Sequence, residues 1–161
     1  MIKNNYFFQF KKWQCIQHTK VTGKILNIDI TNIYRNAGSL VVIFQTNPAN
    51  SQPKDNSIFD HENVRNLWME IGGKRYLKES WDLDSDNNDY CLAYDVFQDF
   101  KRTGIKTDSL LYVDIIYFKN KYPMYSVDLS DQPQSISGAK SNVILHVDFN
   151  KAPIGTDEGT I

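Results

Sequence analysis

The sequence predicts a mainly β protein, an antiparallel β-sandwich, and two neighbouring stretches carry this prediction. Residues 39–46 read SLVVIFQT, in which five apolar residues stand in a row, three of them β-branched. Such a run is typical of a strand covered on both faces, so we expect it at the centre of the core. Residues 47–60 hold two prolines with several Ser and Asn, a composition typical of a long surface loop. A buried strand that feeds a long loop is typical of jelly-roll sandwiches, because their chain crosses between sheets.

Four further segments alternate apolar and polar residues with the period of a strand that has one wet face. They are residues 24–31, 64–71, 124–129 and 143–149. The inward row of the last segment is Val143, Leu145, Val147 and Phe149. Strands with this pattern bury one face only, which fits the two sheets of a sandwich.

Gly72 and Gly73 form a two-residue connection after the strand at 64–71. Glycine takes a positive φ at little steric cost, as both central positions of a tight hairpin turn require. The chain then returns through residues 74–77. We therefore expect a β-hairpin in which Ile71 pairs with Lys74.

One segment, at about residues 89–103, changes to the period of a helix. The apolar residues that recur there at three- and four-residue spacing are Leu92, Ala93, Val96, Phe97 and Phe100. Asn88 or Asp89 is expected to cap the first turn, and Gly104 stands where a helix normally ends. The sequence therefore predicts one inserted α-helix that buries Leu92, Val96 and Phe100.

Residues 110–118, LLYVDIIYF, leave two interpretations open. Their composition is that of a strand. Asp114 could equally cap a short helical turn that runs to Lys119. Periodicity does not decide between the two.

Length and charge restrict the classes of protein that the chain fits. With 161 residues it is predicted to form a single domain, 1–161, with an N-terminal arm at 1–12. A net charge of -1 gives no overall field for nucleic acid or for an anionic membrane. No apolar run is long enough for a signal peptide or a transmembrane helix, which favours an intracellular product. Cys15 and Cys91 are expected to be core thiols, with a disulfide as the lesser alternative.

The acidic loop before the predicted helix imitates the start of a calcium-binding loop, with Asp82, Asp84 and Asp86 at alternate positions. The glycine expected at the sixth position is Asn87, and the closing glutamate is replaced by Ala93. We therefore expect a solvated loop that caps the helix, and no metal site.

The sequence contains no arrangement typical of catalysis. Asp60, His61 and Glu62 are adjacent, so their side chains diverge in an extended segment, and a surface turn is the favoured interpretation. We find no G-x-S-x-G and no phosphate-binding loop in the sequence. We therefore expect neither catalysis nor a cofactor.

The tryptophans carry separate expectations. Trp68 lies on the face of its strand opposite Leu67, Met69 and Ile71, either in a second layer of core or at a contact surface. For Trp13 and Trp81, burial in the core is favoured.

Several stretches together resemble one known family. They are FQTNPANSQPKDNSIFDHENVRN (44–66), YCLAYDVFQDF (90–100), YPMYSVDLSDQ (122–132) and VILHVDFN (143–150). These stretches are similar to the C-terminal jelly-roll region of the double jelly-roll major capsid proteins of Maverick/Polinton-type and adintovirus-like elements. The resemblance extends over most of the chain from about residue 13.

The resemblance implies a structural shell protein of a virus or virus-derived element, located in the virion, without catalysis or cofactor. Its partners would be further copies of itself in a trimer-type assembly, or other capsid proteins. It also favours the helical turn at 114–118. The family carries two jelly rolls in tandem, whereas the sequence accounts for one.

The relatives also continue past a Gly-Thr pair, corresponding to residues 159–160, into one more hydrophobic strand. We therefore expect residues 143–149 to form an open sheet edge that pairs with another chain. The residues expected at this interface are Val143, Leu145, Val147 and Phe149, with Trp68 as a further contact residue. The alternative is a recognition module, for example a carbohydrate binder that uses Trp68 or Tyr112.

Overall fold

The computed structural model describes residues 13–18, 21, 23–31, 38–45, 58–77, 79–102, 113–129 and 142–153. The predicted N-terminal arm at 1–12 and most of the predicted loop at 47–60 lie outside these residues. The described part is mainly β and entirely antiparallel, as the sequence predicts.

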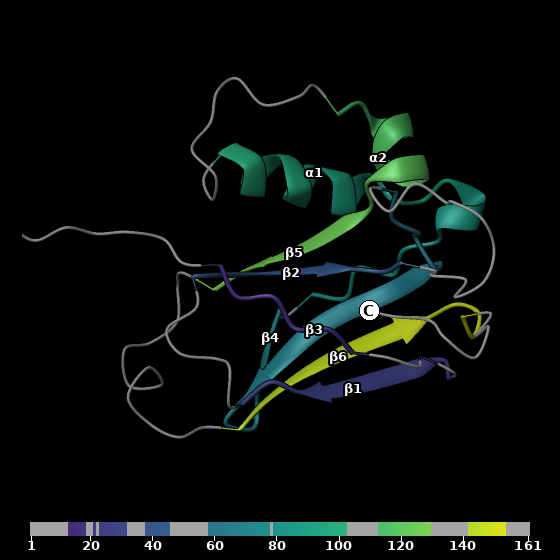
Figure 1. Ribbon diagram of the computed structural model, residues 1–161. Coiled ribbons are helices and arrows are strands. Elements are labelled where there is room, and N and C mark those ends of the chain that lie inside the picture. Colours follow the sequence, from purple (N-terminus) through teal and green to yellow (C-terminus); the bar gives the residue numbers. More distant parts are fainter. Residues whose placement is uncertain are drawn as a thin grey trace, which may run out of the picture.

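The larger sheet has four strands in the order β1-β6-β3-β4. Their bounds are Ile25–Asp29 for β1, Val143–Phe149 for β6, Val64–Ile71 for β3 and Lys74–Tyr76 for β4. The smaller sheet pairs β2, Ser39–Ile43, with β5, Met124–Asp128. In Figure 1 the small sheet lies between the larger sheet and two helices, α1 (Cys91–Phe100) and α2 (Ile115–Lys121). A short 3-10 helix, η1 (Ser85–Asn87), precedes α1.

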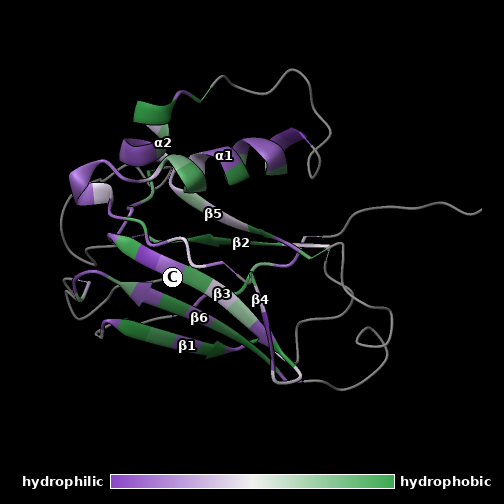
Figure 2. Ribbon diagram, turned by 180° about the vertical axis from the view of Figure 1, so that it is seen from behind, coloured by the Kyte–Doolittle hydropathy of each residue, from purple (hydrophilic) through white to green (hydrophobic). Residues whose placement is uncertain are grey.

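Much of the core lies between the two sheets, where β3 and β6 each supply four buried apolar residues. Figure 2 shows both hydrophobic and hydrophilic residues along each of these strands. The inward rows are almost fully buried, from Val64 to Ile71 on β3 and from Val143 to Phe149 on β6. Edge-to-face ring contacts join the sheets through Phe44. The centroid of its ring lies 5.9 Å from that of Tyr125 and 5.4 Å from that of Phe149.

The expectation that residues 39–46 form the centre of the core is wrong. Their strand, β2, pairs only with β5 among the described strands, and Leu40, Val41 and Ile43 are half-buried. Val42 and Phe44 are buried, and Phe44 contacts Phe149 of the larger sheet. The apolar run at residues 40–44 is therefore fully buried only at Val42 and Phe44.

The expectation that β6 is an open sheet edge is also wrong. In an antiparallel ladder, bonded residue pairs alternate with non-bonded pairs. The bonds Phe149 N–H to Lys24 O and Ile30 N–H to Val143 O show that the odd-numbered residues of β6 bond to β1. Gly72 N–H donates to Asn142 O in the same register that pairs β6 with β3, so the even-numbered residues bond to β3. Both sides of β6 are therefore occupied.

The helical layer differs from the prediction in its bounds and in its buried face. The helix α1 begins at Cys91, after Tyr90 as N-cap, and neither Asn88 nor Asp89 caps it. Ala93 and Phe97 are buried against β5, whereas Leu92 is 44% exposed. The buried stripe is thus rotated by one residue, because the neighbouring sheet selects among several apolar positions.

The structure contains a second helix where the sequence left two interpretations open. Asp114 is the N-cap of α2, and its side chain accepts a hydrogen bond from Tyr117 N–H. This confirms the helical interpretation and corrects the prediction of a single helix. Phe118 is buried against Tyr94 and Phe97 of α1.

The burial predictions for four single residues have mixed outcomes. Trp81 is buried, as predicted. Trp13 is 62% exposed, with its ring edge-on to Phe100. Cys15 and Cys91 are both exposed free thiols, so the expectation of core thiols is wrong.

The hairpin at Gly72 and Gly73 is confirmed. Ile71 pairs with Lys74, and the two glycines have φ of 57 and 78 degrees. A Cβ added at Gly73 would meet no atom within 4 Å. The glycine is therefore required for its backbone conformation and not for space.

We predict that Gly73→Ala lowers the free energy of unfolding by about 1–2 kcal/mol, the cost of a left-handed backbone for an L side chain. Gly38→Ala is the matched control, since its added Cβ also meets nothing within 4 Å and its φ is not in the left-handed region. The control should stay within about 0.5 kcal/mol of wild type. Chemical denaturation measures both, and equal effects would contradict the assigned turn.

We predict that Phe97→Ala lowers the free energy of unfolding by about 3–5 kcal/mol, because a buried aromatic is lost between α1 and α2. Leu92→Ala, on the exposed side of α1, should cost under about 1 kcal/mol. Urea unfolding of both variants tests the rotated stripe. If Leu92→Ala lowers the free energy of unfolding more than Phe97→Ala does, α1 buries the face predicted from the sequence and the rotated stripe is wrong.

Candidate functional site

The strongest cluster of chemically active side chains lies on the outer face of the larger sheet, around Trp68. β3 and β6 are neighbours, and their register sets Trp68 directly opposite His146. The indole and imidazole rings stack with an interplanar angle of 3 degrees and centroids 4.9 Å apart. Both side chains point away from the core because residues of one strand alternate between the two faces.

Arg75 of β4 covers the indole from the other side. Its guanidinium carbon lies 4.5 Å from the centroid of the Trp68 ring, a cation–π contact. β6 and β4 flank β3 on opposite sides, so His146 and Arg75 approach the indole from opposite directions. Trp68 is therefore held between two side chains, and mainly its ring edge remains available.

Polar contacts fix the orientation of the imidazole. His146 Nδ1 lies 2.8 Å from Asn27 Oδ1 on β1, and Nε2 lies 3.6 Å from Glu70 Oε2. A carboxamide oxygen only accepts a hydrogen bond, so Nδ1 is the donor in the contact with Asn27. Nε2 is buried without a hydrogen-bond partner among the described residues. The cluster thus links all four strands by side chains as well as by backbone bonds.

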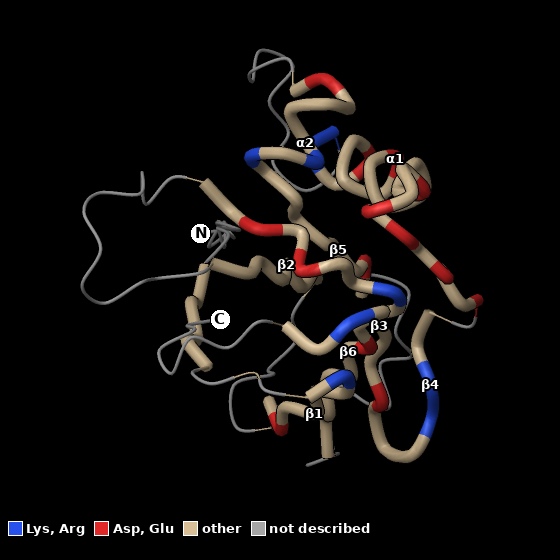
Figure 3. The backbone as a smooth tube through the Cα atoms, turned by 90° about the vertical axis from the view of Figure 1, so that its right-hand side faces the viewer, with Lys and Arg blue, Asp and Glu red and all other residues tan. Residues whose placement is uncertain are grey.

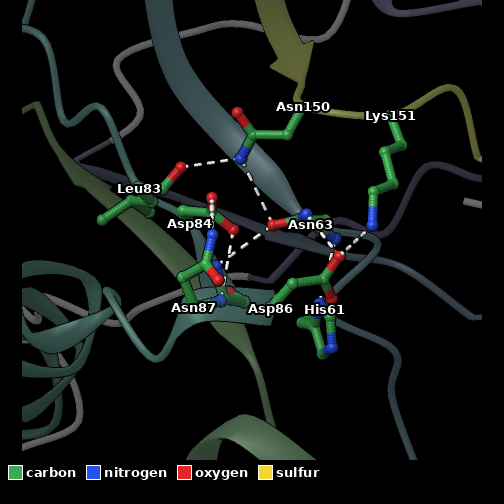
Figure 4. A network of polar contacts seen from close by, with 9 residues as sticks. His61, Asn63, Leu83, Asp84, Asp86, Asn87, Asn150 and Lys151 are labelled. Carbon is green, nitrogen blue, oxygen red and sulfur yellow. Dashed lines mark hydrogen bonds and ion pairs between the residues drawn. The ribbon is translucent and has the colours of Figure 1, made fainter.

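A second polar cluster lies where the loop before α1 meets the ends of β3 and β6, and its centre is Asn63 (Figure 4). The buried Asn63 side chain donates to Asp86 Oδ2 at 2.8 Å and accepts from Ser85 N–H and from Asn150 Nδ2. Asn150 Nδ2 also donates to Leu83 O at 2.8 Å. Asn63 has a φ of 47 degrees, a conformation that Asn tolerates better than most residues.

His61 belongs to the same cluster and is neutral in it. Its Nδ1 accepts a hydrogen bond from Asn63 N–H at 2.9 Å, and its carbonyl oxygen accepts one from the buried Tyr125 hydroxyl. Burial lowers the pKa of His61, and Lys119 adds to this effect while Asp86 and Asp60 oppose it. Burial also raises the pKa of the Tyr125 hydroxyl. The cluster therefore depends on an unprotonated imidazole.

The three aspartates that imitate a calcium loop have separate partners. Asp82 pairs with Arg65 at 2.9 Å, and Asp86 pairs with Lys151 at 2.7 Å. Asp84 accepts from the Asn87 side chain and caps η1, which lowers the pKa of this carboxyl. Across the described ranges, no group of three or more acidic, His or Cys side chains could hold a metal ion. The absence of a calcium site stays a prediction.

The structure separates the five residues that the sequence predicts at an interface. Trp68 lies on the outer face, half-buried, which leaves its role as a contact residue a prediction. Val143, Leu145, Val147 and Phe149 are buried between the sheets and are not available for a partner. The prediction fails for these four because it rested on β6 being an edge.

Sequence reasoning missed the residues that surround Trp68 and those that form the Asn63 cluster. Arg75 gave no local signal, since its contact with Trp68 depends on strand pairing. Asn63 and Asn150 also gave no sequence signal of their contact with each other. The one available hint was that Asn in a short polar turn often takes a left-handed backbone conformation. Their partners are up to 87 residues apart in the chain.

Charges of both signs are distributed over different elements, as Figure 3 shows. Acidic residues gather on α1, and basic residues lie on β4 and α2. No single-sign field emerges from a chain with a net charge of -1. In the part of the chain that the structure describes, no helix is both long and apolar enough to cross a membrane.

The two antiparallel sheets, packed face to face over one core, define a β-sandwich of the jelly-roll class. A family model described as the double jelly roll-like domain matches residues 3–157. The chain therefore belongs to the double jelly roll-like domain family, a domain type typical of viral capsid proteins. No curated protein and no solved structure gives a significant match.

We predict that the free energy of unfolding falls as the pH is lowered through about 6.5, the ordinary pKa of histidine, because of His61. The unfolded chain takes up a proton there, whereas folded His61 has a lowered pKa and resists protonation. The unfolded state is thus favoured until the folded pKa is reached, and below it the loss is constant.

The matched variant is His61→Gln, whose side-chain oxygen can also accept the Asn63 N–H. Urea unfolding between pH 5 and 8, the range about the ordinary histidine pKa, should show a steeper pH dependence for wild type than for the variant. If the unfolding free energy of wild type and of His61→Gln changes with pH in parallel, His61 does not contribute to the pH dependence of stability.

Proposed function

We propose that this chain is a structural, self-associating capsid-type protein of a virus or of a virus-derived integrated element. The observation that carries the proposal is the family match, which extends over residues 3–157 of a chain of 161. The sequence resemblance to Maverick/Polinton-type capsid proteins supports the finer assignment to that kind of element. The role is located in the virion and involves neither catalysis nor a cofactor.

The partners in this proposal are further copies of the chain, in a trimer-type assembly, or other capsid proteins. A jelly-roll sandwich suits such a role because its two sheets form a stiff unit with loops at both ends. The link of all four strands of the larger sheet through Asn27, His146, Trp68 and Arg75 supports a rigid unit. Rigid units assemble at a low entropic cost.

The outer face of the larger sheet argues against the alternative of a carbohydrate binder centred on Trp68. Sugar rings stack on an exposed aromatic face, whereas both faces of this indole are covered by His146 and Arg75. Tyr112, the other aromatic considered for this role, lies outside the described residues. The geometry around Trp68 therefore favours the structural role.

The oligomeric state of the purified chain tests the proposal. We expect sedimentation velocity over a rising concentration series to show reversible association, and electron microscopy of the associated sample to show discrete closed particles or sheets. A glycan array should show no binding. A strictly monomeric chain at the highest attainable concentration, or saturable glycan binding, would contradict the proposed function.

A further inference from the structure

The larger sheet ends in two edges of different character, β1 and β4. The free edge of a strand presents unpaired N–H and C=O groups to any second strand, and proteins protect such edges with Lys, Pro, bulges or short length. β4 has only three residues, which include Lys74 and Arg75. β1 has five residues, ILNID, with no proline, no basic residue and no bulge against β6. β1 is the less protected edge.

The register with β6 shows which backbone groups of β1 face outward. Lys24 and Ile30 exchange hydrogen bonds with Phe149 and Val143 at the two ends of the ladder, so the even-numbered residues bond to β6. By alternation, the N–H and C=O groups of Ile25, Asn27 and Asp29 point away from β6. Among the residues that the structure describes, no strand pairs with β1 on that side.

We propose that the free edge of β1 pairs antiparallel with β1 of a second copy of the chain, across a two-fold axis at Asn27. The inference rests on the proposed self-association and adds to it a two-fold contact between copies, separate from the trimer-type contact. This register pairs Asn27 with Asn27 and Ile25 with Asp29 in both directions. It uses every outward backbone group of β1, because these are the residues whose N–H and C=O face the edge.

The side chains fit the same register on both faces of the joined sheet. On the inner face, Leu26 lies opposite Ile28 of the partner copy. Leu26 is buried, and Ile28 is only partly covered in the single chain, so the contact extends the core across the axis. On the outer face, Asp29 meets Ile25, which is 66% exposed, and no like charges are placed opposite each other.

The interaction therefore replaces solvent around a strand edge with a complete ladder, in the manner of β-augmentation. Asn27 keeps its side-chain contact with His146, since that contact lies on the outer face. The two-fold pairing is isologous, so a single contact joins two copies and then stops.

The variant Ile25→Pro tests the pairing directly. Proline is tolerated at the first residue of an edge strand, and the Ile25 N–H that it removes faces the free edge. By symmetry it blocks both Ile25–Asp29 pairs, so we expect the dissociation constant of the β1 contact to rise by about tenfold or more. Ile25→Lys is the second variant, because a lysine at an edge opposes pairing without a change in backbone conformation.

Ile116→Lys is the matched control. Ile116 of α2 is 63% exposed, close to the 66% of Ile25, so its substitution removes the same apolar surface far from the β1 edge. Circular dichroism should show all three variants folded. Sedimentation velocity should show weaker association for both Ile25 variants and wild-type association for Ile116→Lys.

Hydrogen exchange followed by NMR gives a test within one strand. At low concentration the amides of Ile25, Asn27 and Asp29 should exchange rapidly and those of Leu26 and Ile28 slowly. At high concentration the three outward amides should become protected. If the chain associates but these amides exchange equally fast at both concentrations, or if both Ile25 variants associate like wild type, the β1 inference fails and the proposed function stands. A strictly monomeric chain overturns both.

Discussion

The hydrogen bonding of β6 on both of its sides is the constraint on which the rest of the structure depends. This strand comes last among the described elements, and it lies between β1 from the start of the chain and β3 from its middle. Its inward row fills the centre of the core, and its outward row carries His146. The sheet has no continuous core until β6 arrives, so formation of the fold requires contacts between distant parts of the chain, which are slow to form.

The period of the sequence predicted where strands lie and which side chains point inward, because burial of one face imposes alternation. The identity of a strand's neighbours leaves no such local mark. His146 contacts Asn27 across 119 residues, and nothing around either residue indicates the other. For the same reason, Leu92 and Ala93 fit the helical period equally well, and only β5 beneath α1 decides which is buried. Trp68 was predicted on its correct face, but its two covering side chains were not.

Two buried asparagines attach the loop before α1 to β3. Asn66 accepts from Trp81 N–H and donates to Ser80 Oγ, while Asn63 bonds to Ser85 N–H and Asp86. Carboxamides suit these positions because each supplies both donors and acceptors without a charge to bury. The loop also buries Trp81 and Leu83 in the core, so apolar burial and hydrogen bonds hold it together. Its aspartates act as structural acceptors in this arrangement.

The outer face of the larger sheet carries few groups that would drive non-specific association. The large aromatic that the structure describes on this face, Trp68, is covered by the His146 imidazole and the Arg75 guanidinium. An apolar patch binds partners in many orientations, whereas a strand edge binds only in the registers that its N–H and C=O groups allow. The proposed shell role would require the same contact repeated in one geometry. Among the described residues, His146 and Arg75 cover Trp68 while no strand pairs with the outer side of β1. The pairing that we propose therefore uses the backbone of this edge, where register allows few arrangements.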